Sequence, residues 1–564
     1  MASTSAETTQ IPIKSKKTQD PEKYPDWYSP ETGIYHSKYP PISLPTDPFL
    51  DVVSFIFSHQ HNGVSALVDS SSGSSISYSE LFPLVKSIAS GLHHSGVSQH
   101  DVVLVLLPNS IFFPVVFLST LYLGAIVTPM SPLSSTCEIK KRIADCNVKF
   151  VFTVSDKIDQ IRSCGVNPIL VPETRNFDPT KIEYSEFHKL VTNDFLDFPR
   201  PLISQQDVAA IMYSSGTTGA SKGALVTHGN LISMVELFVR FEAFQYEYPS
   251  TENVYLALVP MFHIYGMALF VMGLFSLGTT VVVMKRFFIN EVVEAIEKFK
   301  VTHFPSVPPL LCQLIAKAKC VDGCKLRSLK QICCGAAPTS KKLIEDCLKT
   351  LPHVDFIQGY GMTETTAVGT RGFNTASLYN YTSIGLMAPN TQAKIVDWTT
   401  GSPLPPGKSG ELWLRCPAIM KGYLNNVEAT RLTIDEEGWL HTGDVVYFDQ
   451  DGYLYLSDRL KEMIKYKGFQ IAPADLEAVL ICHPEILDVA VTSMLDEEAG
   501  EVPVAFVVRE NGSTLTKKAV MDFLAQQVAP YKKVREVIFT QSIPKSPAGK
   551  ILRRELKQLL TSKL

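Results

Sequence analysis

A segment rich in glycine and hydroxyl side chains has the composition of a phosphate-binding loop. It runs from Tyr213 to Gly223 and directly follows the apolar residues 208–212. Its glycines let the backbone turn sharply and bring N–H groups close to an anion, while hydroxyls and a lysine add side-chain donors. The order of residues differs from that of a Walker A loop, and we expect the segment to join a strand to a helix. The candidate phosphate donors are Ser214, Ser215, Gly216, Thr217, Thr218 and Lys222.

Four later segments combine carboxylates, lysines and turn residues. In chain order they are Gln358–Glu364, Trp439–Asp444, Ser457–Gln470 and Pro544–Lys550. The first two end in a carboxylate, which can accept hydroxyl donors or hold a hard cation. The last places Lys550 on a loop rich in proline and glycine. Each segment on its own is weak evidence of function, because solvated lysines and surface turns are common.

Taken in this order, the five segments resemble the motifs of the adenylate-forming superfamily, which includes acyl-CoA synthetases, luciferases and peptide-synthetase adenylation domains. The resemblance covers residues 50–561. Three further segments look like those of plant 4-coumarate–CoA ligases and their peroxisomal relatives, namely Pro260–Tyr265, Gly335–Pro338 and Lys465–Pro473. The resemblance implies an ATP-dependent acid–CoA ligase that makes an acyl-AMP and then an acyl-CoA, using ATP, Mg²⁺ and CoA.

The resemblance also implies roles for individual residues. Lys550 matches the catalytic lysine of the first half-reaction, and Glu364, next to Thr363, helps to hold Mg²⁺. His263 is either a core histidine or, from its place between an apolar strand and a glycine-containing loop, a gate of the pocket. Asp444 holds the ribose hydroxyls. Besides the loop donors, ATP and AMP are bound by Gln358, Gly359, Thr363, Asp444, Arg459, Lys461, Lys465, Gln470 and Lys550. CoA is bound by Arg286, Lys467 and Gly468. The acyl pocket is lined by Tyr265, Leu269, Ala336, Gly361, Val368 and Arg371.

Besides Ala220-Ser221 in the phosphate loop, where the family usually has Leu-Pro, three positions depart from the pattern of coumarate ligases. Arg286 replaces a lysine that faces CoA and keeps the positive charge, so it still suits a phosphate. In the acyl pocket Leu269 stands in place of a serine, and Arg371 stands in place of a methionine. A charge at the end of this pocket is costly to bury unless it has a carboxylate partner or reaches solvent.

These departures shape the expected substrate. Leu269 removes a hydroxyl that could meet a ring substituent, which favours a hydrophobic aryl-alkenoic acid or a medium-length oxylipin-like acid. Free 4-hydroxycinnamates are expected to be weaker substrates. The alternatives are a 4-coumarate–CoA ligase proper, a luciferase-like adenylating oxygenase, and a non-catalytic nucleotide-binding protein on the same fold.

Composition excludes several other classes of protein. The chain has 564 residues, is 45% hydrophobic and carries a net charge of −4, which argues against disorder and against a nucleic-acid-coating surface. Eleven cysteines are too few for a disulfide scaffold, so reduced thiols are expected. Two uncharged runs, 102–137 and 254–284, are long enough to span a bilayer. Prolines and glycines interrupt both, so we interpret them as buried strands and helices.

Hydrophobic patterning predicts an α/β fold. Residues 46–457 alternate strand-like and helix-like runs and form a large N-terminal body of doubly wound sheets with a β-rich part near its end. Residues 1–45 are expected to be a surface arm, 458–461 a hinge, and 462–561 a small mobile α/β lid domain. The tripeptide 562–564, Ser-Lys-Leu, matches the address read by the peroxisomal import receptor. A monomeric enzyme of the peroxisomal matrix is therefore expected.

Overall fold

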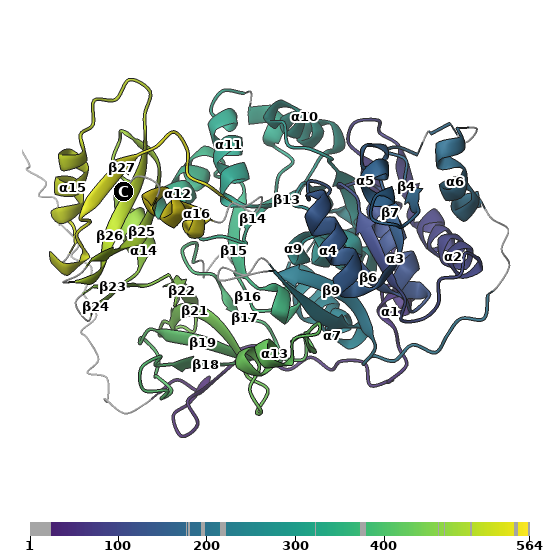
Figure 1. Ribbon diagram of the computed structural model, residues 1–564, viewed down its shortest axis with the longest axis horizontal. Coiled ribbons are helices and arrows are strands. Elements are labelled where there is room, and N and C mark those ends of the chain that lie inside the picture. Colours follow the sequence, from purple (N-terminus) through teal and green to yellow (C-terminus); the bar gives the residue numbers. More distant parts are fainter. Residues whose placement is uncertain are drawn as a thin grey trace, which may run out of the picture.

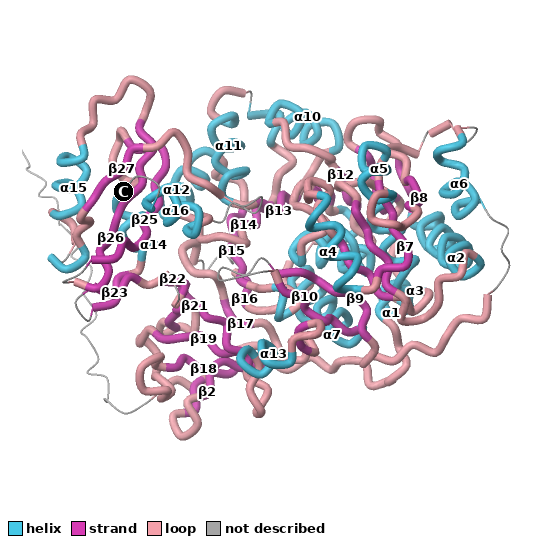
Figure 2. The backbone as a smooth tube through the Cα atoms, in the orientation of Figure 1, coloured by secondary structure: helices cyan, strands magenta, loops and turns pink. Residues whose placement is uncertain are grey.

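The computed structural model describes residues 24–561, except 176, 179–180, 193–197, 215–220, 247, 322, 373–379, 461, 467–468, 497–498, 529 and 546–550. A large body is followed by a small domain, which is yellow in Figure 1 and lies at one end of the molecule. The tube in Figure 2 shows strands at the centre of both parts, with helices against their faces. The expected α/β class with a large N-terminal body and a small C-terminal domain is confirmed.

The first sheet of the body is parallel over most of its width. In spatial order its strands are β20 (Gly422–Tyr423), β10 (Lys222–Thr227), β9 (Val208–Ser214), β6 (Ile126–Pro129), β5 (Val102–Leu106), β7 (Val148–Thr153) and β8 (Pro168–Leu170). Strands β9, β6, β5, β7 and β8 run parallel, whereas β10 and β20 are antiparallel at the edge. The helices of this part are α1 (Val52–Ser58), α2 (Tyr78–His94), α3 (Phe112–Tyr122), α4 (Thr136–Cys146), α5 (Ile158–Arg162), α6 (Ser185–Thr192) and α7 (His228–Met234).

The second sheet has nine strands and carries the same kind of parallel centre. In spatial order it contains β17 (Leu386–Met387), β16 (Thr370–Arg371), β15 (Asp355–Tyr360), β14 (Gln331–Cys334), β13 (His303–Ser306), β11 (Val254–Ala257), β12 (Thr280–Val283), β3 (Ser65–Asp69) and β4 (Ser75–Ser77). Its helices are α8 (Phe241–Ala243), α9 (Ile264–Gly266), α10 (Ile289–Phe299), α11 (Pro308–Ala318) and α12 (Lys341–Thr350). One continuous apolar core joins the inner faces of both large sheets through the buried helix α3 and the π-helical segment Met267–Met272.

The uncharged runs of the sequence form this core. Strand β5 is buried along its whole length, and α3 is apolar on every side because helices and sheets surround it. Within the described residues no helix is both long and apolar enough to cross a bilayer. The interpretation of these runs as buried strands and helices is therefore confirmed.

The β-rich part of the body also takes in residues from the start of the chain. Its sheet has the order β1 (Tyr28–Ser29), β2 (Ile34–His36), β18 (Gln392–Val396), β19 (Gly410–Arg415), β21 (Leu440–Phe448) and β22 (Leu454–Arg459), with α13 (Val427–Thr433) nearby. Tyr35 is fully buried, stacks on Phe448 with ring centroids 4.6 Å apart, and donates to the carbonyl of Leu404 at 2.7 Å. The expectation of a surface arm is wrong for residues 28–36, because their aromatic side chains complete the core of this sheet.

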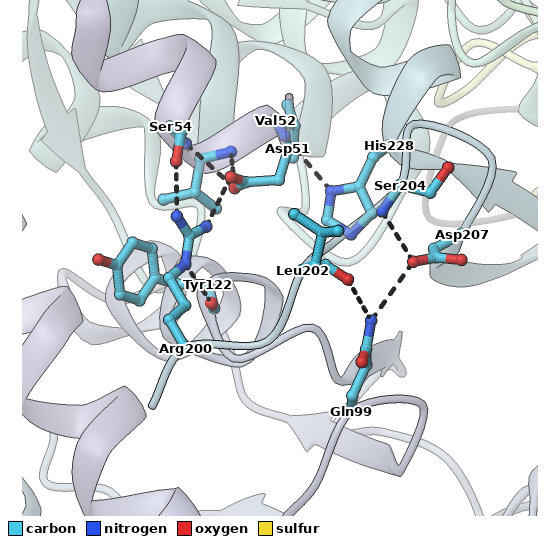
Figure 3. A network of polar contacts seen from close by, with 11 residues as sticks. Asp51, Val52, Ser54, Gln99, Tyr122, Arg200, Leu202, Ser204, Asp207 and His228 are labelled. Atoms are coloured by element: carbon cyan, nitrogen blue, oxygen red, sulfur yellow. Dashed lines mark hydrogen bonds and ion pairs between the residues drawn. The ribbon is translucent and has the colours of Figure 1, made fainter. Parts of the chain in front are cut away.

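A polar network fixes the start of helix α1 to the body (Figure 3). Asp51 caps the helix by accepting N–H groups of Val53 and Ser54, and its other oxygen pairs with Arg200 at 2.5 Å. The ring of His228 accepts the N–H of Val52 at 3.3 Å. Burial lowers the pKa of His228 to about 4, so this histidine is neutral at physiological pH and acts as an acceptor here.

The small domain is built on a sheet of five strands. These are β24 (Phe469–Ile471), β23 (Ile464–Tyr466), β26 (Gly500–Arg509), β25 (Ile486–Asp496) and β27 (Glu536–Phe539), with helices α14 (Pro473–Leu480), α15 (Lys517–Ala525) and α16 (Arg553–Thr561). Strands and helices are both present, as expected for a small α/β domain. An apolar core of its own lies between this sheet and helices α14 and α15.

Candidate active site

Several of the residues singled out in the sequence follow the parallel strands of the nine-stranded sheet. Strands β11, β12, β13, β14 and β15 run parallel, so their carboxyl ends meet at the same edge. His263 follows β11, Arg286 follows β12 and Ala336 follows β14. Gly361 and Glu364 come directly after β15. Ligands of doubly wound folds bind at this edge, because loops from several strands converge there.

The phosphate-loop segment lies between two consecutive strands that pair antiparallel, β9 and β10. Ser214 ends β9 and lies opposite Lys222, which begins β10. Between them Ser215, Gly216, Thr217 and Thr218 lie outside the described residues. The expectation that the segment leads into a helix is wrong at this point, since residues 222–227 form β10 and pair with β9 before helix α7 begins. Lys222 is exposed, and its Nζ lies 5.0 Å from the ring centroid of Tyr423.

Tyr423 connects this hairpin to Glu364. The tyrosine lies on β20 opposite Ala224 of β10, and its hydroxyl donates to Oε1 of Glu364 at 2.8 Å. Burial, with Glu364 as a second cause, raises the pKa of Tyr423, so the hydroxyl keeps its proton as a donor. The backbone beyond the short helical turn Thr363–Thr365 is left-handed at Thr366, with φ of 49°. Glu364 is thus a buried carboxylate that Tyr423 holds, and the ring of the same tyrosine lies near Lys222.

Asp444 is the second buried carboxylate of the site. Its Oδ2 accepts the hydroxyl of Tyr360 at 2.7 Å, and its Oδ1 lies 3.0 Å from Nε of Arg459. Asp444 and Arg459 are opposite each other on β21 and β22, so strand pairing sets this distance. Burial opposes the charge of Arg459, but Asp444 and Tyr360 raise its pKa. The adjacent Gln358 is buried and donates to the carbonyls of Tyr381 and Ser383.

The six residues expected to line the acyl pocket come from four neighbouring segments. Leu269 and Val368 are buried, and Tyr265 donates weakly to the carbonyl and the thiol of Cys333, at 3.4 and 3.3 Å. A side chain at Gly361 would lie 2.5 Å from the carbonyl of Ala367, so only glycine fits there. Ala336 is exposed at the end of β14 and has a left-handed φ of 65°.

The environments of His263 and Arg371 differ sharply. His263 is half-buried between β11 and α9, and burial lowers its pKa, which favours a neutral ring. Arg371 is 7% exposed and its Nε donates to Oε2 of Glu242. Its guanidinium also lies over the ring of Phe238, 4.8 Å from the centroid. The condition stated for burying this arginine, a carboxylate partner, is therefore met.

The remaining predicted residues belong to the small domain or border it. Lys461, Lys467, Gly468 and Lys550 lie outside the described residues, as do the side chains of Lys465 and Gln470. The backbones of Lys465 and Gln470 are opposite each other on β23 and β24. Arg286 is exposed on the loop after β12.

Three site residues were not predicted from the sequence. Tyr423 belongs to none of the five segments, and only its pairing with β10 brings it to Glu364. Tyr360 lies within a recognised segment, but its role as a donor to Asp444 depends on contact with a distant strand. Glu242 could have been found from the sequence. It is a carboxylate in the largely apolar stretch 231–244, and a buried carboxylate requires a partner.

A different cavity, of about 790 Å³, lies at the opposite edge of the nine-stranded sheet. Its walls include Tyr246, Tyr248, Lys330 and His353, near the amino ends of β14 and β15. None of the predicted site residues lines it. We therefore place the candidate site at the carboxyl ends, where the charged groups converge.

The described residues contain no group of three histidine, cysteine, aspartate or glutamate side chains arranged to hold a metal. Mg²⁺ is usually held by only one or two carboxylates together with substrate phosphates. A single buried carboxylate, Glu364, beside a loop suited to phosphates fits that pattern.

Comparison with known proteins identifies the family of the chain. Residues 57–424 match the model of the AMP-binding enzyme family, and residues 475–550 match that of the AMP-binding enzyme C-terminal domain. The chain is 59% identical to the 4-coumarate–CoA ligase-like 6 protein of Arabidopsis thaliana, covering 98% of each chain. It is 43% identical to the peroxisomal OPC-8:0-CoA ligase 1 of the same plant, covering 94% of this chain and 97% of the relative.

Solved structures share the fold at lower sequence identity. ATP-bound MatB from Rhodopseudomonas palustris superimposes with a TM-score of 0.83 at 24% identity, over 91% of this chain and 99% of that chain. The o-succinylbenzoate CoA synthetase of Bacillus subtilis, in complex with its acyl-adenylate, gives a TM-score of 0.76 at 25% identity, over 90% and 98% of the two chains. The chain belongs to the AMP-binding, adenylate-forming enzyme family. It is an AMP-forming acid–thiol ligase of the acyl-CoA synthetase type.

Proposed function

We propose that this ligase activates a hydrophobic aryl-alkenoic acid or a medium-length oxylipin-like acid as its acyl-AMP and transfers the acyl group to CoA. The observation that carries the proposal is the convergence of two buried carboxylates on the edge of the sheets that holds the phosphate-loop hairpin. Glu364 and Lys222, which both contact Tyr423, suit Mg²⁺ and phosphates, and Asp444 suits the two hydroxyls of a ribose.

In the first half-reaction a carboxylate oxygen of the acid attacks the α-phosphorus of ATP, and the bond to the leaving pyrophosphate breaks. Two anions must approach each other, so oriented binding and positive charge both lower the barrier. Lys222 and the donors of its hairpin loop would offset charge on the phosphates, and Lys550 would act from the small domain. Mg²⁺ at Glu364 would neutralise further phosphate charge when bound.

In the second half-reaction the CoA thiolate attacks the acyl carbon, and AMP leaves with the bonding electron pair. We propose that the small domain turns about residues 458–461 between the two steps, which withdraws Lys550 and brings Lys467 and Gly468 to CoA. Arg286 is exposed and cationic, as a contact for a CoA phosphate requires. A mobile second domain would let one active site catalyse both half-reactions.

The pocket residues support a hydrophobic substrate. Leu269 is buried and offers no hydroxyl to a ring substituent, and the charge of Arg371 is balanced by Glu242. The relatives include both coumarate-ligase-like proteins and an OPC-8:0-CoA ligase, which fits either an aryl or an oxylipin-like acid. A 4-coumarate–CoA ligase proper and a luciferase-like oxygenase are the alternatives. Light emission from a luciferin without CoA would identify the latter.

The substrate class is tested by kcat/KM for pyrophosphate release and for thioester formation. We expect cinnamate, a ring-blocked cinnamate and medium-chain acids to be used better than 4-coumarate. Leu269→Ser should shift the preference towards 4-coumarate by about 5- to 10-fold, because a hydrogen bond to the ring hydroxyl contributes roughly 1 kcal/mol.

Leu277→Ser, a substitution elsewhere in the same apolar core, is the matched control for added polarity. A wild-type enzyme that prefers 4-coumarate outright, with no change in Leu269→Ser, would contradict the pocket assignment. If none of these acids caused release of pyrophosphate from ATP, the ligase proposal for this substrate class would be contradicted.

We further propose that the enzyme acts in the peroxisomal matrix. The similarity to a peroxisomal ligase and the Ser-Lys-Leu tripeptide at 562–564 support this location. A fluorescent protein fused to the N-terminus should give a punctate signal that overlaps a peroxisomal marker, and removal of residues 562–564 should make it diffuse. A cytosolic signal from the intact fusion would refute the proposal.

A further inference from the structure

A buried ion pair lies in the wall of the expected acyl pocket. Arg371 is on β16, opposite Gly359 of β15, and Glu242 is on α8. The two residues are 7% and 6% exposed. Nε of Arg371 donates to Glu242, and the guanidinium covers the face of Phe238.

The guanidinium also contacts the residues that line this pocket. A Cβ added at Gly359 would lie 2.7 Å from Nη1 of Arg371, so the guanidinium rests against the backbone of β15. It interacts with the thiol of Cys333, which in turn accepts the hydroxyl of Tyr265 at 3.3 Å. Burial opposes its charge, but Cys333, Glu242 and Tyr265 keep the pKa of Arg371 well above its usual value. The group is therefore a permanent cation inside an apolar wall.

Stability alone does not account for this pair. Replacing a buried ion pair by apolar side chains of similar volume is often neutral or stabilising, since desolvation offsets the Coulomb attraction. A guanidinium has five N–H donors in a rigid fork. In the described part of the chain its hydrogen-bond partners are one carboxylate and one thiol, so the fork retains capacity for another acceptor.

We propose that Arg371, held by Glu242, is a specificity-determining residue that recognises an uncharged carbonyl oxygen at the distal end of the acid substrate. The proposal rests on the ligase function and narrows its substrate class. The recognised group is uncharged because Glu242 already balances the cation, and a second carboxylate would bring uncompensated negative charge into a buried site. An oxo group on an otherwise hydrophobic chain or ring meets both requirements.

The test uses medium-chain acids in which a ketone is moved one carbon at a time, each compared with the unsubstituted acid of equal length. Wild-type kcat/KM for acyl-CoA formation should peak at one ketone position, where it exceeds that of the unsubstituted acid by about 10- to 100-fold, as expected for a hydrogen bond to a charged donor. A flat profile, with all acids used equally well, would overturn the inference while leaving the ligase function intact. Absence of turnover with every acid would instead contradict the proposed function.

Variants test whether the ion pair causes the preference for the keto acid. Arg371→Met combined with Glu242→Leu leaves no unpaired charge and should abolish the preference for the keto acid, so that both acids are used within about 2-fold of each other. Arg371→Lys keeps the charge without the planar fork and should give an intermediate preference. The matched control is Arg175→Met with Glu80→Leu, which removes an exposed arginine–glutamate pair next to β4, at the opposite edge of the nine-stranded sheet from β16 and β17, and should keep the wild-type profile. If the double variant at Arg371 and Glu242 kept the preference for the keto acid, the role assigned to Arg371 would be overturned. If that variant does not fold, the wild-type profile over the keto acids tests the proposal by itself.

Discussion

Replacing Lys550 by alanine is expected to slow acyl-AMP formation by about 10²- to 10³-fold, the usual loss when one preorganised donor to a developing charge is removed. Thioester formation from supplied acyl-AMP should stay within a few-fold of wild type, because the proposed second half-reaction withdraws this lysine. The measurement is pre-steady-state pyrophosphate release beside the rate at which CoA consumes the purified adenylate.

The described residues on either side of the segment that contains Lys550 are anchored in the small domain. Lys545 and Ile551 form an antiparallel bridge, and Lys545 pairs with Asp488 at 2.6 Å. Lys557→Ala, on the exposed side of helix α16, is the matched control and should leave both rates unchanged. Equal slowing of both half-reactions by Lys550→Ala would show that this lysine has no role specific to adenylation.

Carboxylates cluster around one arginine of the small domain. Arg553 of helix α16 pairs with Glu462 and with Glu477, each at 2.7 Å. Asp458, at the end of β22, is close enough to contribute to the same field and accepts the N–H of Ala474 at 2.9 Å. Burial raises the pKa of Glu477 to about 7 even though Arg553 opposes the shift. Burial also raises the pKa of Asp458.

We expect the small domain to become more stable as the pH falls from about 8 to about 5. A carboxyl whose pKa is higher in the folded state binds its proton more tightly there, so its contribution is complete below the unfolded pKa and is lost as the pH rises through about 7. For Glu477 alone the gain over this range is about 2–3 kcal/mol. Hydrogen exchange of the β25 and β26 amides in the full chain, corrected for intrinsic rates, measures it.

The variant Glu477→Gln should remove most of this pH dependence, because an amide does not titrate. The exposed Glu555→Gln serves as the control and should keep the wild-type slope. If wild type and Glu477→Gln show the same dependence, the carboxyl of Glu477 does not bind the proton. Since Asp458 lies in the expected hinge, the same cluster connects protonation to the segment about which the domain is proposed to turn.

Much of the fold follows from local sequence patterns. Residues 148–153, 208–214 and 331–334 are short apolar runs bounded by turn residues, and each is a strand of a mainly parallel sheet. Short-range patterns are reliable here because burial on both faces demands continuous apolar side chains. The pattern failed for residues 28–36, whose polar neighbours suggested an arm. Tyr35 is buried only because β18, more than 350 residues away in sequence, pairs with this segment.

Residue types alone predict which segments carry the chemistry. Glycines and hydroxyls in one loop, and carboxylates at the ends of two segments, reveal their potential wherever they lie, because residue type fixes what a group can donate or accept. The sequence also identified Arg371 as a residue that needs a carboxylate partner if it is buried, since an isolated charge cannot be left in an apolar wall.

Only the tertiary structure decided which partner each of these groups has. Glu242 and Arg371 are 129 residues apart, and Tyr423 and Glu364 are 59 apart, so no local pattern connects them. Their contacts arise where antiparallel edge strands and helices fold over the carboxyl ends of the parallel strands. The packing of whole sheets sets the distances between these groups. It therefore decides which groups pair, and with them the shape and polarity of the acyl pocket.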